Sequence, residues 1–99
     1  MDVRTEGELK AAIADGYALV DFWATWCGPC QMMGRAIESE LVPAMPALKV
    51  VKVNVDEAPE LAASFGVVSI PSLFCFRNGA QCGAFVGVTD VAEIRRCFA

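Results

Sequence analysis

Two cysteines spaced two residues apart, in Trp26-Cys27-Gly28-Pro29-Cys30, join a strongly apolar segment to an amphipathic one. The preceding segment, Ala18–Ala24, is too apolar for a surface strand and predicts a central strand buried on both faces. After the pair, apolar residues recur every four positions, as on the buried face of a helix: Met33, Ile37 and Leu41. The cysteines are therefore expected where a central strand leads into the N-terminus of a helix.

This position predicts different reactivities for Cys27 and Cys30. First-turn amides and the positive end of the helix dipole stabilise a thiolate by about 0.3–2 kcal/mol, and about 1.4 kcal/mol corresponds to one pKa unit. The pKa of Cys27, the outer residue, should lie below the free value of about 8.5, whereas Cys30 should be more buried and less acidic. Pro29 suits the first turn, where its missing N–H is not needed, and it stiffens the loop. We predict that Cys27 attacks a substrate disulfide and that Cys30 resolves the mixed disulfide.

The spacing alone does not separate a redox pair from a structural pair or from half of a zinc site. Tetrahedral zinc requires four nitrogen or sulfur ligands. The sequence has no histidine, and the other three cysteines show no second CxxC spacing: Cys75, Cys82 and Cys97. The redox interpretation is favoured, and no metal site is expected.

Composition limits the class of protein further. With 99 residues, 56% of them hydrophobic and 20% charged, the sequence fits one domain, 1–99, with a well-filled core. A net charge of −4 without a basic cluster argues against a nucleic-acid partner. No apolar run approaches the ~20 residues of a membrane span, and the N-terminal segment lacks the apolar core of a signal peptide. An odd number of cysteines, five, fits poorly with a secreted disulfide framework. We therefore expect a cytoplasmic protein without membrane contact.

The order of predicted elements indicates an α/β protein with a parallel core and an antiparallel hairpin. Pro43 and Pro46 are expected to end the cysteine helix. The remaining elements follow from caps, β-branched runs and turn signals: a short edge strand at Met1–Arg4, a helix from the capping box Thr5/Glu8 to about Gly16, a strand at Leu48–Val55, a short helix from Pro59 to Gly66, strands Ser72–Arg77 and Gln81–Val86 around Asn78-Gly79, and a last helix capped by Thr89 or Asp90.

Asp21 is the one acidic residue within the apolar strand before the cysteines. A carboxylate in such a run would be desolvated, and burial raises the pKa of an aspartate toward neutrality. The functional hypothesis is that Asp21 deprotonates Cys30 during resolution, through water. The alternative is a polar residue at the strand end that faces solvent.

Several motifs together resemble the thioredoxin family from the first helix to the last. They occur in the family's order and spacing: Asp21–Cys30, Lys52-Val53-Asn54-Val55-Asp56, Ile70-Pro71-Ser72, Asn78-Gly79 and Val86-Gly87. The resemblance implies a thioredoxin fold, with a mixed five-stranded sheet whose first strand is short and four flanking helices. It also implies a monomeric protein disulfide reductase without a bound cofactor. Its substrates would be disulfide-containing proteins, and an NADPH-dependent thioredoxin reductase would reduce it back to the dithiol.

The resemblance also suggests roles for individual residues. The family has a buried aspartate at the position of Asp21 and a lysine near it, which Lys52 matches; the alternative for Lys52 is an edge lysine whose stem snorkels to water. Trp26 would be exposed and offer an apolar surface for substrate docking; the alternative is that its side chain packs in the core. A cis Ile70-Pro71 bond would face the cysteines, so that the Ile70 backbone pairs with an extended substrate segment. The implied substrate-contacting residues are Trp26, Gly28, Pro29, Ile70, Pro71 and Gly87, with Lys52 and Pro29 tuning thiol pKa values.

Two residues depart from the family's pattern. Gln31 stands where the family usually has a basic residue, and Arg35 replaces a helix-kinking proline, which predicts a straighter helix.

If Asn78-Gly79 closes a two-residue hairpin, Cys75 faces Cys82 on one side of the sheet. We expect both to be reduced core residues, although a cross-strand disulfide is an alternative and a bulge would remove the pairing. Cys97 is expected to be partly buried.

Two other functions compete with disulfide reduction. An oxidase or isomerase would use the same chemistry at a different redox potential. A docking module would use the fold for binding and would not need the cysteines. The Gly-Pro dipeptide between the cysteines and the absence of an export signal favour the reductase.

Overall fold

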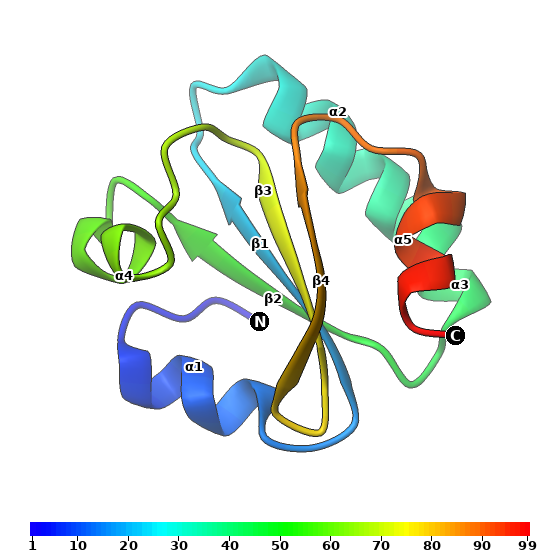
Figure 1. The fold of residues 1–99 in the computed structure, drawn as a ribbon. Coiled ribbons are helices and arrows are strands. Elements are labelled where there is room, and N and C mark those ends of the chain that lie inside the picture. Colours follow the sequence, from blue (N-terminus) through cyan, green and yellow to red (C-terminus); the bar gives the residue numbers. More distant parts are fainter.

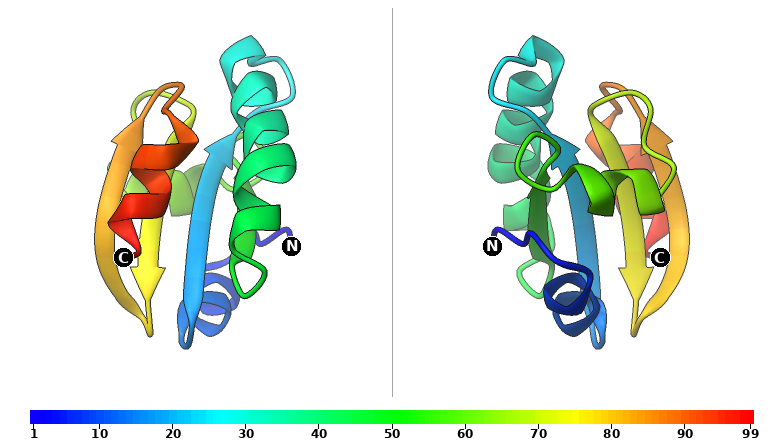
Figure 2. Two further views of the ribbon diagram at one scale, coloured as in Figure 1. Left: turned by 90° about the vertical axis from the view of Figure 1, so that its right-hand side faces the viewer. Right: turned by 90° about the vertical axis from the view of Figure 1, so that its left-hand side faces the viewer.

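A mixed sheet lies between two layers of helices in the computed structural model, which describes residues 1–99. Figure 1 shows α1 and α4 on one side of the sheet and α2, α3 and α5 on the other. The two views of Figure 2 bring each of these layers to the front in turn. The elements in chain order are α1 (Glu6–Ile13), β1 (Tyr17–Trp23), α2 (Gly28–Ala36), the π-helix η1 (Ile37–Leu41), α3 (Val42–Ala44), β2 (Lys49–Asn54), α4 (Pro59–Ser64), β3 (Ser72–Arg77), β4 (Ala80–Val86) and α5 (Val91–Cys97).

The sheet has four strands in the order β2-β1-β3-β4, so the prediction of five strands was wrong. β1 and β2 are parallel, whereas β3 is antiparallel to both of its neighbours. The predicted edge strand at Met1–Arg4 is reduced to a single bridge between Asp2 and Lys52. This short segment makes three main-chain hydrogen bonds to β2: Val3 N–H to Lys52 O, Lys52 N–H to Met1 O, and the N-terminal ammonium of Met1 to Val50 O.

The central strand β1 is buried on both faces, as its apolar sequence predicted. Ala18, Val20 and Phe22 pack in one core with residues of α1 and α4. Leu19, on the opposite face, packs in a second core beneath α2 and α5. Because side chains alternate along a strand, Asp21 points to the same face as Leu19, toward α2. This alternation places an acidic residue between the sheet and the cysteine helix.

Pro43 does not end the cysteine helix, which corrects that prediction. The helix stays regular through Arg35, widens into the π-turn of η1 at Ile37–Leu41, and continues as α3 to Ala44. In a regular α-helix the proline ring would clash with the carbonyl of Ser39, four residues earlier. The wider turn directly before Pro43 is the kind of local adjustment that accommodates such a residue. Pro46 lies beyond the helix end, as expected.

Three other local predictions are confirmed: the first capping box, the cap of the last helix and the hairpin turn. Thr5 and Glu8 form the reciprocal capping box of α1, and the Asp90 side chain accepts a hydrogen bond from Ala92 N–H at the start of α5. The turn Asn78-Gly79 joins β3 to β4 with positive φ at both residues, 51° and 83°. These positive values are typical of the tight turns that match the twist of a hairpin.

Cys75 and Cys82 do not face each other, because the bulge that would remove their pairing is present, and the expectation that both lie in the core is wrong for Cys82. Phe76 pairs with Gln81, but the register then shifts, and Cys75 pairs with Gly83. Cys82 is therefore the extra residue of a β-bulge, which locally increases the twist of the strand. Cys75 is buried, Cys82 is exposed and neither forms a disulfide.

Candidate active site

Cys27 and Cys30 lie at the predicted junction between β1 and α2. Cys27 is the N-cap of α2, and Cys30 N–H donates a hydrogen bond to Cys27 Sγ over 3.1 Å. The two residues form a disulfide, with Cα atoms 5.2 Å apart. Gly28 and Pro29, both exposed, form the first turn between them, where the proline lacks only an N–H that the helix does not need. One helix N-terminus thus holds both sulfurs.

The two sulfurs are almost equally covered in this disulfide state. Cys27 is 5% exposed and Cys30 is 4% exposed, so burial alone does not separate them as predicted. Their surroundings do differ. Cys27 Sγ lies 3.9 Å from the carbonyl oxygen of Ile70, whereas Cys30 lines a pocket behind the helix N-terminus. This asymmetry places one sulfur beside a backbone acceptor and the other beside ionisable side chains.

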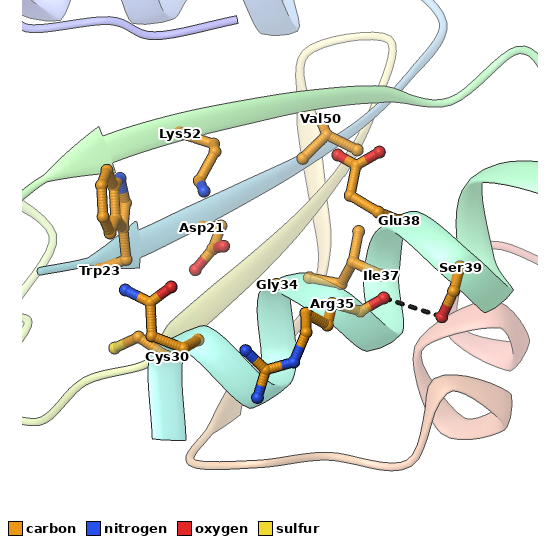
Figure 3. A pocket seen from close by; sticks show the side chains of 11 residues that line it. Asp21, Trp23, Cys30, Gly34, Arg35, Ile37, Glu38, Ser39, Val50 and Lys52 are labelled. Atoms are coloured by element: carbon orange, nitrogen blue, oxygen red, sulfur yellow. Dashed lines mark hydrogen bonds between the residues drawn. The ribbon is translucent and has the colours of Figure 1, made fainter. Parts of the chain in front are cut away.

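The pocket behind the disulfide has a volume of about 590 Å³. Figure 3 shows Asp21 and Lys52 of the sheet on one wall and Cys30 with Arg35 of α2 on the other. Asp21 is only 1% exposed, and its Oδ1 has no hydrogen-bond partner within the protein. The solvent-facing alternative for Asp21 is therefore excluded. A buried carboxylate now shares a pocket with the inner cysteine.

Burial raises the pKa of Asp21 from its ordinary value of 3.8 to about 6, and the positive charge of Lys52 partly opposes this rise. Lys52 is the register partner of Asp21 in the parallel β1–β2 pair. Its amine lies over the Trp23 ring, 4.3 Å from the centroid, a cation–π position. Trp23 itself is half-buried, and its ring lies beneath this amine.

Several residues predicted to contact substrate have groups that are exposed or close to Cys27. Trp26 is 69% exposed, which excludes core packing, and its Nε1–H donates to Asp56 Oδ2 over 2.8 Å. The Ile70–Pro71 peptide bond is cis, as the resemblance implied. Gly87 has a φ of +83°, and its N–H donates to the carbonyl of Pro71. No atom lies within 4 Å of a Cβ built at Gly87, so the space above it is open.

Three polar contacts at the site were missed by the sequence reasoning. Asp56 fixes the Trp26 indole, the Gln31 amide donates to Thr25 O over 3.4 Å, and Thr89 N–H donates to Met33 Sδ over 3.3 Å. Asp56 was within a quoted motif, but only its position beside Trp26 reveals its contact. The other two contacts join loops to α2, and no sequence signal indicated them.

The structure contains no group of three or more His, Cys, Asp or Glu side chains arranged to hold a metal ion. It also contains no helix that is long and apolar enough to cross a membrane. The candidate site consists of the disulfide, the pocket behind it and the exposed Trp26.

The thioredoxin family model matches residues 2–99. The chain belongs to the thioredoxin family. It is 40% identical over 90 residues to the thioredoxin of Listeria monocytogenes, covering 91% of this chain and 87% of that one. It is 42% identical over 84 residues to the thioredoxin of Alicyclobacillus acidocaldarius, covering 84% and 80% of the two chains. The structure is similar to that of a mutant thioredoxin from Halobacterium salinarum, with a TM-score of 0.85 and 33% identity over 97% of this chain and 84% of that one.

Family membership and the geometry agree. Thioredoxins are thiol–disulfide oxidoreductases that act on disulfide substrates and are reduced by thioredoxin reductase, and this chain carries the redox-active pair Cys27–Cys30 in a thioredoxin fold. The first family strand is the part of the fold that is nearly absent here.

Proposed function

We propose that this chain reduces disulfide bonds in proteins through the reversible Cys27–Cys30 couple. The observation that carries the proposal is the position of the disulfide, at a helix N-terminus, next to the exposed Trp26 and in front of a pocket with a buried carboxylate. The active unit is the single thioredoxin domain 1–99, working as a monomer in the cytoplasm. It needs no bound cofactor.

In the first step, the Cys27 thiolate attacks one sulfur of a substrate disulfide. The bond between the substrate sulfurs breaks, a mixed disulfide with Cys27 forms, and the other substrate sulfur leaves as a thiolate that takes a proton from solvent. The attacking Cys27 thiolate is stabilised by the Cys30 N–H, which faces Cys27 Sγ, and by the N-terminus of α2.

In the second step, Cys30 breaks the mixed disulfide. Asp21 accepts the Cys30 proton through water, and the Cys30 thiolate attacks Cys27 Sγ. This forms the Cys27–Cys30 disulfide and releases the second substrate sulfur as a thiolate, which takes up a proton from solvent. A carboxyl group whose pKa is about 6 is mostly ionised at neutral pH, yet it is more basic than an ordinary aspartate. Burial sets this raised pKa of Asp21, and the positive charge of Lys52 limits the rise because it favours the ionised carboxylate.

Trp26, Gly28 and Pro29 form the docking surface beside the outer sulfur, together with Ile70, Pro71 and Gly87. The exposed indole offers apolar contact, and the Ile70 backbone offers a carbonyl for an extended segment of substrate. The partner that restores the dithiol is an NADPH-dependent thioredoxin reductase, and the substrates are proteins with accessible disulfides.

Insulin reduction coupled to NADPH and a thioredoxin reductase tests this proposal. The unmodified chain should turn over, whereas Cys27→Ser should be inactive and Cys30→Ser should accumulate a mixed disulfide on Cys27. Cys82→Ser is the matched control, because it removes an exposed thiol outside the site and should leave the rate unchanged. A chain that binds insulin or the reductase but transfers no electrons would instead be a docking module.

A further inference from the structure

Three thiols outside the active site gather on one face of the β3–β4 hairpin. Cys75 lies on β3, Cys82 on the bulge of β4 and Cys97 at the end of α5, and all three are free. Cys75 and Cys97 belong to the core beneath α5. The disulfide-exchange mechanism uses none of them.

The sulfur of Cys97 lies directly over the bulge. Cys97 Sγ–H donates to the carbonyl oxygen of Cys82 over 3.1 Å. A Cβ added to Gly83 would overlap Cys97 Sγ, so the thiol occupies the volume that a side chain at position 83 would fill. Gly83 is the register partner of Cys75, and directly opposed Cβ positions lie about 4.5–5.5 Å apart. Cys97 therefore contacts both hairpin cysteines.

The three thiols differ in access to solvent. Cys75 is fully buried, Cys97 is half-buried and Cys82 is exposed. Burial raises the pKa of both the Cys75 and Cys82 thiols, and their contacts with Cys97 raise the pKa of each further. Because Cys82 is the most exposed of the three thiols, an oxidant in solution reaches it first, and Cys97 is the thiol in contact with it.

We propose that Cys82 and Cys97 form a second dithiol–disulfide couple, which a low-molecular-weight disulfide such as oxidised glutathione oxidises. Cys82 attacks one sulfur of the oxidant, which forms a mixed disulfide and releases one glutathione thiol. Cys97 then attacks Cys82 Sγ, which forms the Cys82–Cys97 bond and releases the second thiol. Two protein thiols are oxidised, one small disulfide is reduced, and the two protons lost by the protein end on the two glutathione thiols.

This couple is independent of Cys27–Cys30. Cys27 follows the C-terminal end of β1, whereas the hairpin turn is next to the other end of that strand, where Tyr17 pairs with Arg77. The two couples therefore lie toward opposite ends of the sheet and do not exchange within one molecule. The new disulfide would tie the C-terminal helix α5 to the edge strand β4, which has a neighbour on one side only.

The test uses the fully reduced chain and increasing oxidised glutathione, followed by acid quenching, alkylation of free thiols and mass-spectrometric mapping of linked peptides. The expected map contains Cys27–Cys30 and, at higher oxidant, Cys82–Cys97, with a further mass loss of two hydrogens. In Cys97→Ser, a glutathione adduct should remain on Cys82, because no thiol is there to displace it. Formation of Cys27–Cys30 in that variant shows that it is folded.

Cys75→Ala is the matched control and should retain the Cys82–Cys97 bond. Four results would overturn the proposal: a stable glutathione adduct on Cys82 in the unmodified chain, a bond from Cys97 to Cys75, a bond between two copies, or complete alkylation of all three thiols at every oxidant concentration. If Cys75→Ala does not fold, the linkage map of the unmodified chain still decides between Cys75 and Cys82.

Discussion

Asp21 and Lys52 are register partners across β1 and β2, yet they form no ion pair, since the Lys52 amine lies over the Trp23 ring instead. The carboxylate therefore remains buried without a close counter-charge. This explains why desolvation outweighs the attraction of Lys52 and leaves the pKa of Asp21 at about 6.

The raised pKa predicts that folding stability depends on pH. Between the ordinary pKa of 3.8 and the folded value of about 6, the folded chain binds more protons than the unfolded chain, so stability falls as pH rises through this window. A shift of about two pKa units corresponds to about 3 kcal/mol at most. Asp21→Asn should be more stable than the unmodified oxidised chain at pH 8, by up to that amount, with a smaller difference at pH 4. Urea unfolding at both pH values measures this, and an equal difference at both would contradict it.

Asp21→Asn should also slow disulfide reduction while the fold stays intact, because an amide cannot accept the proton of Cys30. In the unmodified chain the rate should rise with pH through about 6, as the carboxylate forms, and the variant should lack this rise. Insulin reduction measured from pH 5 to pH 8 gives both profiles. An unchanged rate in the variant between pH 6 and pH 8 would remove the role proposed for Asp21.

Lys52→Met should raise the pKa of Asp21 above about 6, because the lysine charge lowers it in the unmodified chain. The methionine keeps a side chain of similar length over Trp23. The titration of the Asp21 carboxyl carbon by NMR should move to higher pH, and the pH–rate profile should move with it. Lys49→Met is the control, because the Lys49 amine pairs with Asp15 at 3.3 Å. An unmoved titration in Lys52→Met would show that another group sets this pKa.

Trp26→Ala should impair substrate docking more than stability. The side chain is 69% exposed, so its loss should change the free energy of unfolding by no more than about 1.5 kcal/mol, including the bond to Asp56. Loss of a docking contact worth about 1.4 kcal/mol would lower kcat/KM for insulin about tenfold. A small aromatic disulfide reagent, which needs no docking surface, serves as the comparison substrate. An equal loss of kcat/KM with both substrates would show instead that Trp26 affects the disulfide-exchange reaction and not docking.

Elements with local signals could be predicted from the sequence, whereas features set by distant contacts could not. The capping box at Thr5 and the Asn78-Gly79 turn depend on adjacent residues and were predicted correctly. The bulge at Cys82 lies against Cys97 of α5, which is distant in the sequence, and the helix continues through Pro43 by way of a π-turn. In the site, Asp21 could be identified because it is the one acidic residue in an apolar strand. No pattern in the sequence indicated that the Lys52 amine lies over Trp23.

The order of alkylation tests the asymmetry of the two active-site sulfurs. In the disulfide state, Cys30 N–H donates to Cys27 Sγ, and Cys30 lines the same pocket as the Asp21 carboxylate. In the reduced chain we expect the first contact to favour the Cys27 thiolate and the second to disfavour the Cys30 thiolate. A difference of one pKa unit gives about a tenfold difference in thiolate fraction. Limiting iodoacetamide at neutral pH should therefore label Cys27 about tenfold faster than Cys30, as read by mass spectrometry of the two modified forms. Faster labelling of Cys30 would reverse the assignment of the attacking and resolving sulfurs, and with it the proposed order of steps.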